Sequence, residues 1–311
     1  MDLRQLRYFV QIAESGNFSR AAEVLRVAQP SLSQQIKQLE EELGAKLLIR
    51  HARGVTTTEQ GLQFYDHARR IIQEVDHARD NVRSQTLAPS GRISVGLPTS
   101  ACRGLSLPLF DVMAARLPNV TLHLVEAMTG YLDELIQAGR LDVALLYDHK
   151  AFEHVAWTEM MTEDLMLFVA KGNPLAKHKS ISFKKLFEHE HVALPGRPNV
   201  LRVVIEQLAA RHEIKLNVKD CDSLPAIAKL VCISNYMAVM PHFAFTDEIN
   251  RGEMIAIPIV NPTPSWNLSV VVSQRTLNAR ASEAVARVMA DLIADMVEKG
   301  TWRAKLRGDR V

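Results

Sequence analysis

Residues 18–42 read FSRAAEVLRVAQPSLSQQIKQLEEE, and this pattern predicts two short helices joined by a tight corner. Ala21, Ala22 and Leu25 give the first helix an apolar stripe, and the small alanines let a neighbouring helix come close. The second helix begins at Gln29-Pro30, because proline at the first helical position loses no hydrogen bond. Its buried face is formed by side chains that recur every three or four residues: Leu32, Ile36, Leu39 and Leu43.

The opposite face of the second helix is polar and suits the major groove of duplex DNA. Serine and glutamine offer donors and acceptors to base edges, and lysine can meet a phosphate. A helix-turn-helix inserts the N-terminal end of its second helix into the groove. The predicted DNA-binding residues of this helix pair and of the segment after it are Ser19, Arg20, Gln29, Pro30, Ser31, Ser33, Gln34, Lys37, Arg50 and Arg53. The alternative is a helical hairpin with a solvated serine and glutamine face.

A β-hairpin with a basic tip is predicted directly after the helix pair. Two short apolar pieces, residues 46–50 and 55–57, flank His51-Ala52-Arg53-Gly54. Such a hairpin beside a helix-turn-helix is a wing, whose cations reach phosphate or the minor groove. A basic turn on its own is more often a solvated loop, but its place after the two helices favours the DNA interpretation.

A long helix is predicted from the cap Thr58 to about Leu87. Its apolar side chains step by four and three residues, the spacing of a coiled-coil seam: Phe64, Ala68, Ile71, Val75, Ala78 and Val82. The alternative is a helix packed on its own domain, which we disfavour because the linker-like residues 88–91 end it. We therefore predict a dimerisation helix over residues 59–90. A two-fold dimer would place two recognition helices about one DNA turn, or a multiple, apart.

From Arg92 the pattern changes to alternating strands and helices, which build a mostly parallel sheet. We predict a two-lobed α/β domain over residues 91–300, in which residues 91–161 and 267–300 form lobe one and residues 162–266 form lobe two. The chain would cross between the lobes near Met161 and Trp266. A basic tail, residues 301–311, follows. With a winged helix-turn-helix over residues 1–58, the predicted fold class is α+β multidomain.

A ligand site is predicted in the cleft between the two lobes, because ligands of such sheets lie at the carboxyl ends of strands and against helix N-termini. The candidate effector-binding residues are Thr99, Ser100 and Thr129, with Pro195-Gly196 and Arg202 from the other lobe. Hydroxyls, backbone N–H groups and one guanidinium suit a small polar or anionic effector. Helix capping is the competing role for each hydroxyl.

Composition sets limits on the function. The chain has 311 residues, 47% hydrophobic and 23% charged, and a net charge of +2, so a DNA partner must be argued from a local patch. Cys102, Cys221 and Cys232 are too scattered for a disulfide framework or a metal site. The sequence shows no signal-peptide core and no apolar run of about 18 residues, so we predict a cytoplasmic protein with no membrane partner.

Catalytic signals are weak. The sequence contains no G-x-S-x-G, no P-loop and no G-x-G-x-x-G, and His189-Glu190-His191 lacks the H-E-x-x-H spacing of a zinc site. Cys102, near a predicted helix N-terminus, could be oxidisable, although an ordinary small residue in a turn is the commoner role. We therefore predict no enzyme activity, no cofactor and no metal.

The chain resembles LysR-type transcriptional regulators from end to end. The motifs that match this family in order and spacing are Leu6-Arg7-Tyr8-Phe9, Phe18-Ser19-Arg20-Ala21-Ala22, Gln29-Pro30-Ser31-Leu32-Ser33, Ile36, Leu39-Glu40, Leu43-Gly44 and Leu47-Leu48-Ile49-Arg50. Looser matches are Leu117-Pro118, residues 135–144 and Met240-Pro241. The resemblance implies a periplasmic-binding-protein-like effector domain and a homotetramer, built as a dimer of dimers, that binds imperfect inverted repeats near promoters. It also makes RNA polymerase a candidate partner and the nucleoid the place of action.

Three departures from the family pattern stand out. Leu48 replaces the usual phenylalanine, and Thr57 and Gln60 make the junction between wing and linker more polar. Ser234-Asn235-Tyr236 replaces a turn that usually contains glycine, and asparagine can adopt the left-handed conformation there.

Two other function classes fit parts of the pattern. One is a solute receptor whose lobes bind a metabolite for transport, which the absent signal peptide argues against. The other is an enzyme that uses the cleft, which needs an acid-base or metal constellation that the sequence lacks. Failure to bind any DNA would favour the receptor.

Overall fold

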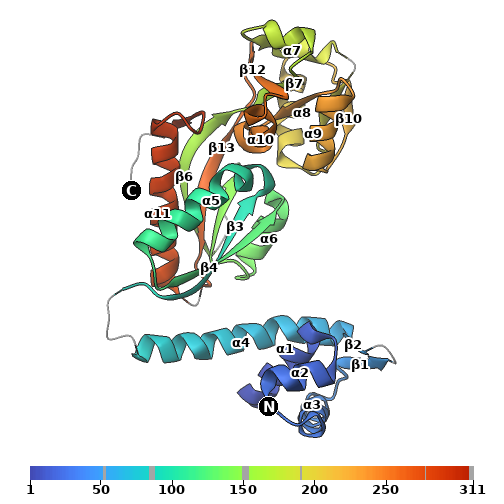
Figure 1. The fold of residues 1–311 in the computed structure, drawn as a ribbon, viewed down its shortest axis with the longest axis vertical. Coiled ribbons are helices and arrows are strands. Elements are labelled where there is room, and N and C mark those ends of the chain that lie inside the picture. Colours follow the sequence, from blue (N-terminus) through green and yellow to red (C-terminus); the bar gives the residue numbers. More distant parts are fainter. Residues whose placement is uncertain (52–53, 84–87, 149–153, 190, 277, 308–311) are drawn as a thin grey trace. The chain divides into compact units, whose positions relative to one another are not determined.

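The computed structural model describes residues 1–51, 54–83, 88–148, 154–189, 191–276 and 278–307, and the chain divides into two compact units, Met1–Leu87 and Ala88–Val311 (Figure 1). The elements of the first unit are α1 (Leu3–Ser15), α2 (Phe18–Leu25), α3 (Gln29–Leu43), β1 (Leu48–His51), β2 (Gly54–Thr57) and α4 (Glu59–Arg83). β1 and β2 pair antiparallel and form the wing. The predicted winged helix-turn-helix is therefore confirmed.

The core of the first unit lies where α1, α2 and α3 meet. Its fully buried side chains include Phe9, Ile12, Leu32, Ile36 and Leu39. The last three of these belong to the face of α3 that the spacing predicts, so the polar face of this helix is turned outward.

Helix α4 packs on its own unit over its first turns. The Phe64 and Phe9 rings lie 5.3 Å apart, and Ala68 is fully buried. The argument that this helix finds nothing to pack on in its own domain is therefore wrong for Phe64 and Ala68, because α1 supplies an apolar face for them. Farther along, Ile71 is 39% exposed, and the side chains of Ala78 and Val82 lie outside the described residues.

Lobe one of the second unit is built on one sheet with the strand order β14-β6-β13-β5-β3-β4. Its strands are β3 (Gly91–Pro98), β4 (Val120–Ala127), β5 (Val143–Tyr147), β6 (Val155–Asp164), β13 (Ser265–Ser273) and β14 (Ala304–Leu306). β3 runs parallel to β4 and β5, whereas β13 pairs antiparallel with β5 and β6. Helices α5 (Thr99–Arg116) and α11 (Ala279–Glu298) cover one face of the sheet, and α6 (Thr129–Gln137) covers the other (Figure 1).

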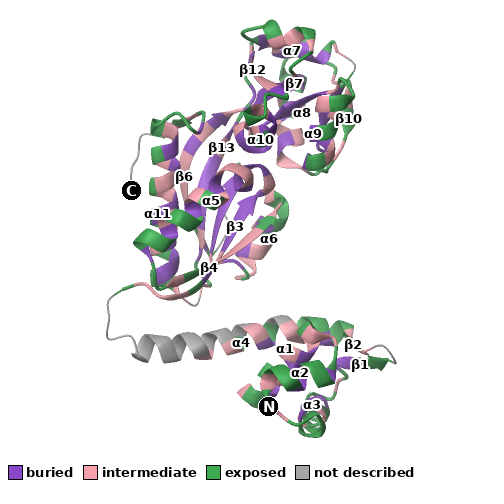
Figure 2. Ribbon diagram, in the orientation of Figure 1, coloured by how far each residue is buried: buried purple, intermediate pink, exposed green. Residues whose placement is uncertain are grey.

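Lobe two has a second sheet, with the order β10-β9-β11-β7-β12-β8. Its strands are β7 (Met166–Ala170), β8 (Ile181–Ser182), β9 (Val192–Leu194), β10 (Val218–Asp220), β11 (Met237–Met240) and β12 (Met254–Val260). Its helices are η1 (Pro174–Lys177), α7 (Phe183–Phe187), α8 (Val200–Arg211), α9 (Leu224–Ile233), η2 (His242–Phe245) and α10 (Thr246–Asn250). Buried strands occupy the centre of each lobe, with exposed positions on the outer helices (Figure 2). Asn235 takes the left-handed conformation, with φ of 55°, as predicted.

The structure corrects the predicted lobe boundaries and the tail. β6 stays in the sheet of lobe one up to Asp164, and β13 joins it at Ser265, so the crossings lie slightly away from Met161 and Trp266. Residues 304–306, predicted as part of a basic tail, form β14 and pair with β6. Basic and apolar residues alternate from Arg303 to Arg307, which is the period of a strand with one side turned to solvent.

The two lobes also meet along helix α5. A Cβ atom on Gly104 would lie 2.4 Å from the Phe243 ring of η2, so only glycine permits this approach. One residue earlier, the Arg103 guanidinium pairs with Asp247 at 2.9 Å and with Glu248 at 3.1 Å. The lobes are thus joined by a packed contact as well as by the crossing strands.

A single buried carboxylate, that of Glu163 on β6, holds parts of both lobes and the C-terminal segment. Its Oε1 accepts from the Trp302 indole at 2.9 Å and from the backbone N–H of His242 at 3.1 Å. Its Oε2 accepts from the Trp266 indole at 2.9 Å. Burial raises the pKa of Glu163, although these three N–H donors act in the opposite direction.

Glu163→Gln is expected to destabilise the second unit by about 1–3 kcal/mol, because the new amide turns a donor toward a buried indole N–H. Since the pKa is raised, folded protein keeps this proton to a higher pH than unfolded protein does. The wild type should therefore lose stability, relative to the variant, as the pH rises from the usual value of 4.5 through the raised pKa.

Urea unfolding of both proteins between pH 4 and pH 8 measures this difference. The exposed Glu188→Gln is the control and should unfold like the wild type at every pH. A Glu163→Gln protein as stable as the wild type across this range would contradict the role given to Glu163.

Candidate DNA interface and ligand pocket

The predicted DNA-binding residues lie on the outer side of the helix pair. Ser19 and Arg20 are in the first turn of α2, and Gln29, Pro30 and Ser31 begin α3. These five residues, together with Gln34, Lys37 and Arg50, are exposed, and Ser33 is half-buried. Arg53 lies outside the described residues.

The N-terminus of α3 is open to a negatively charged partner. Its N-cap, Ala28, offers no side-chain hydrogen bond, and the first turn holds no acidic residue. The unpaired backbone N–H groups and the positive end of the helix dipole therefore face solvent, an arrangement that attracts phosphate.

Arg50 joins the wing to both helices of the pair. Its Nη2 donates to the Ser33 hydroxyl at 2.7 Å, and its guanidinium carbon lies 4.2 Å from the centre of the Phe18 ring. Sequence reasoning predicted Arg50 and Ser33 as separate DNA contacts, whereas the structure brings them into contact with each other. Arg50 thereby fixes the orientation of Ser33 on α3.

Glu40 fixes the start of the wing against α3. Its Oε1 accepts from the N–H groups of Leu47 at 3.0 Å and Leu48 at 3.1 Å, and its Oε2 accepts from Lys46 Nζ at 2.7 Å. Burial raises the pKa of Glu40, but the Lys46 ammonium and the two N–H groups outweigh it, so the pKa lies below its usual value.

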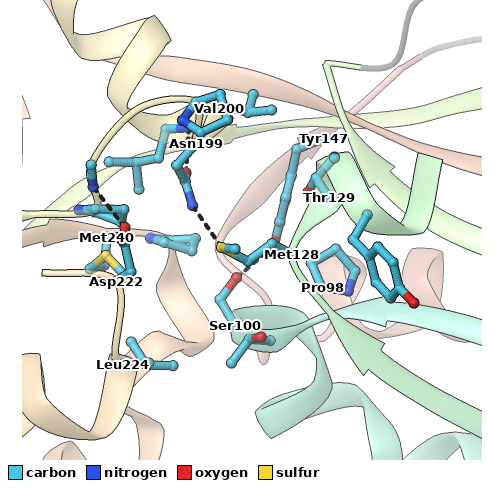
Figure 3. Close-up of a pocket in the computed structure, with 18 of the residues that line it drawn as sticks. Pro98, Ser100, Met128, Thr129, Tyr147, Asn199, Val200, Asp222, Leu224 and Met240 are labelled. Carbon is cyan, nitrogen blue, oxygen red and sulfur yellow. Dashed lines mark hydrogen bonds between the residues drawn. The ribbon is translucent and has the colours of Figure 1, made fainter. Parts of the chain in front are cut away.

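A pocket of about 310 Å³ lies between the two lobes of the second unit, where strands of both sheets end (Figure 3). Pro98 ends β3, Met128 follows β4 and Tyr147 ends β5. Pro195 follows β9 and Met240 ends β11, and both line the pocket from lobe two. The pocket thus occupies the position that parallel sheets give to ligands.

The predicted hydroxyls Thr99, Ser100 and Thr129 line this pocket, as do Pro195 and Gly196. The Ser100 and Tyr147 hydroxyls lie 3.2 Å apart. Tyr147 stacks on Trp266, with ring centres 3.9 Å apart, and burial raises its pKa well above the usual value. A neutral phenol and an indole therefore form one wall of the pocket.

Arg202, the predicted guanidinium of the site, is absent from the described lining residues. Its Nε donates to Glu206 and its Nη1 to Asp220, each at 2.7 Å. The prediction that Arg202 binds the effector is corrected, because these carboxylates on α8 and β10 hold its side chain.

Sequence reasoning missed Asn199, Asp222 and Met128. Asn199 caps α8 through the N–H of Leu201 at 2.9 Å, and its Nδ2 lies 3.8 Å from the sulfur of Met128 across the pocket. Asp222 accepts from the backbone N–H of Gly196 at 2.8 Å. Asp222 follows β10, and Met128 and Asn199 come directly before α6 and α8. The expectation that ligands lie at strand ends and helix N-termini, which identified Thr99, could therefore also have identified these three residues.

Clusters of metal-ligating side chains and membrane-spanning helices are absent from the described residues. None of their histidine, cysteine and acidic side chains form a group of three or more that could hold a metal ion. No helix among them is long and apolar enough to cross a membrane. Burial raises the pKa of the Cys102 thiol to about 11, so this thiol is less reactive than an ordinary cysteine.

Each of the two units matches a known protein-family model. Residues 3–62 match the bacterial regulatory helix-turn-helix protein, lysR family, and residues 87–294 match the LysR substrate binding domain. The second match alone covers more than half of the 311 residues. The chain belongs to the LysR family of DNA-binding transcriptional regulators, as its motifs predicted.

Individual relatives match over nearly the whole chain. The nitrogen assimilation regulatory protein nac of Klebsiella aerogenes is 30% identical over 94% of this chain and 96% of its own length. The Hca operon transcriptional activator HcaR of Escherichia coli K12 is 30% identical over 94% of this chain and 98% of its own length. The first relative is named a regulatory protein and the second a transcriptional activator.

Solved structures confirm the fold. A full-length OxyR variant from Pseudomonas aeruginosa has a TM-score of 0.71 at 21% identity and covers 100% of this chain and 99% of its own. Full-length CbnR in complex with its target DNA has a TM-score of 0.72 at 21% identity, over 95% of this chain and 99% of its own.

Glu40→Gln is expected to destabilise the first unit, because it removes the charge that Lys46 and two backbone N–H groups bind. Since the pKa of Glu40 is lowered, the stabilisation is present above the usual 4.5 and is lost as the pH falls through the lowered value. Thermal unfolding at several pH values measures this, and the exposed Glu23→Gln on α2 is the control, which should unfold like the wild type. A difference between Glu40→Gln and wild type that persists unchanged to pH 2 would contradict the assignment.

Proposed function

We propose that this regulator binds imperfect inverted repeats near promoters as a dimer of dimers and responds to a small effector held between its two lobes. The observation that carries the DNA part is the exposed serine and glutamine surface at the uncapped start of α3. Serine and glutamine read base edges, whereas the backbone N–H groups bind phosphate.

The proposed DNA contacts come from α2, α3 and the wing. Base edges would be read by Ser31, Ser33 and Gln34, with Ser33 held in place by Arg50. Phosphates would be bound by Arg20, Lys37 and Arg53, and Ser19, Gln29 and Pro30 would line the edge of the groove. Residues 59–90 would join two chains through the exposed part of α4, where Leu62 is 61% exposed.

The proposed effector site is the pocket between the lobes, contacted by Thr99, Ser100 and Thr129. Its position at the ends of both sheets supports this, because a ligand there touches both lobes and can change how they close. RNA polymerase is a proposed further partner at the promoter. The proposed place of action is the cytoplasm, at the nucleoid, where the DNA target lies, and we propose no enzyme activity.

Gln34→Ala is expected to weaken binding to the operator by about 1–3 kcal/mol and to leave binding to random DNA nearly unchanged, because a base contact is lost while phosphate contacts remain. Gel-shift titrations on both DNAs, with the operator taken from genome-wide binding, measure the two affinities. Gln207→Ala on α8 removes an exposed glutamine outside the proposed DNA and dimer surfaces and should change neither. Equal losses on operator and random DNA would count against base reading by Gln34.

Lys37→Ala is expected to make the affinity for DNA less dependent on salt. The slope of log K against log salt concentration should become shallower by about one unit, because each phosphate contact releases about 0.9 counterion. Lys37 is 71% exposed and its only described ion pair is with Glu41 at 3.5 Å, one helical turn away. Lys299→Ala, which breaks a similar pair with Asp295 on α11, is the control. An unchanged slope for Lys37→Ala would remove this residue from the phosphate contacts.

A further inference from the structure

We infer that the pocket between the lobes selects a small ligand with no net negative charge, of the primary-amide type: an acceptor oxygen toward lobe one and an N–H donor toward Asp222 of lobe two. The inference rests on the proposed effector site and specifies its ligand. It replaces the anionic effector that the sequence predicts from Arg202.

The volume and the lining of the pocket limit the size and the polarity of the ligand. A volume of about 310 Å³ is at the lower end for ligand pockets, so a single ring or a short branched chain fills it. Most of the described lining residues are apolar, and the Tyr147–Trp266 stack presents flat surface. Apolar and aromatic walls favour a compact apolar body with few polar groups.

The charged side chains around the pocket disfavour an anion. The charged residues among the described lining are Glu134, Arg197 and Asp222. Arg197 is 72% exposed and its Nε donates to Glu206 at 2.7 Å, while Arg202 is bound to the same Glu206 and to Asp220. These contacts also hold the pKa of Glu206 below its usual range, with the Arg202 hydrogen bond as the largest cause.

The two acidic residues that remain, Glu134 and Asp222, are exposed and form no ion pair among the described residues. Asp222 receives one hydrogen bond, from the Gly196 N–H, and that bond uses only its Oδ1. Its second oxygen is left to accept from a ligand. Figure 3 shows Asp222 on the lobe-two side, with Ser100 and Thr129 on the lobe-one side. A ligand carboxylate would meet an unneutralised like charge, whereas an amide N–H would meet an acceptor.

Lobe one supplies the matching donors. Helices α5 and α6 both begin at the pocket, and their N-caps, Pro98 and Met128, provide no side-chain hydrogen bond. In lobe two, by contrast, Asn199 caps α8 and Ser223 caps α9. The open helix starts each carry about half a positive charge, which a carbonyl oxygen satisfies without placing a full negative charge beside Asp222.

The test compares acids with their primary amides of the same shape, using the full-length protein and calorimetry at pH 7. The probe pairs are benzoate with benzamide, and phenylacetate with phenylacetamide. The amide is expected to bind at least about tenfold more tightly than its acid, because the acid brings a like charge near Asp222. An acid that binds as tightly as its amide, or binding of none of the four probes, overturns the inference.

The variant Asp222→Asn is expected to gain affinity for the acids, a result that a damaged fold would not produce. The asparagine oxygen keeps the Gly196 N–H bond, while the charge is lost, so benzoate and phenylacetate are expected to gain affinity and benzamide to change little. Asp111→Asn makes the same change in net charge on the exposed side of α5 and should alter no affinity. No gain for the acids in Asp222→Asn contradicts the role of this carboxylate.

Gel shifts on the operator separate this inference from the proposed function. Specific DNA binding without any preference for amides would overturn the inference about the ligand and leave the proposed DNA-binding function standing. Amide binding without an effect on DNA binding would keep the ligand class and remove the proposed effector role.

Discussion

The packing of the second unit depends on the hydrogen bonds to one buried carboxylate, that of Glu163, which forms no ion pair among the described residues. Glu163 receives N–H groups from Trp266, Trp302 and the backbone of His242, so β13, the C-terminal segment and lobe two all converge on it. An isolated buried charge costs several kcal/mol, and donors on every side are the condition for tolerating it. The positions of these three elements are therefore determined together. Since Trp266 also lines the pocket and stacks on Tyr147, the pocket wall is fixed by the same arrangement.

The helix-turn-helix was predictable because its signals are local. The apolar spacing of Leu32, Ile36 and Leu39 fixes which face of α3 is buried, and Pro30 fixes where the helix begins. The outward position of Gln34 follows from these two facts. The contact of Arg50 with Ser33 and Phe18 was not predictable, because it depends on how the wing folds back on the helices rather than on any pattern within one element.

In the α/β unit, the residues that were predicted from the positions of strands line the pocket, whereas the residue whose side chain is held by other partners does not. Thr99, Ser100 and Thr129 follow strands of a parallel sheet, so topology alone brings them to the pocket. Arg202 has the right chemistry, but Glu206 and Asp220 hold it, and neither partner is evident from spacing. The last strand was missed because the charges of residues 303–307 suggested a tail, although their alternation is that of a half-buried strand.

The buried Trp302 means that the segment directly after α11 is part of the hinge between the lobes. It is 1% exposed, contacts Phe243 of lobe two and donates to Glu163 of β6. A premature stop codon in place of the Trp302 codon would therefore spare every part of the helix-turn-helix and remove a residue that joins the two lobes. In a cell that also makes the intact chain, such a product could occupy promoters and pair with normal subunits while failing to transmit a signal, so its genetic effect would be dominant.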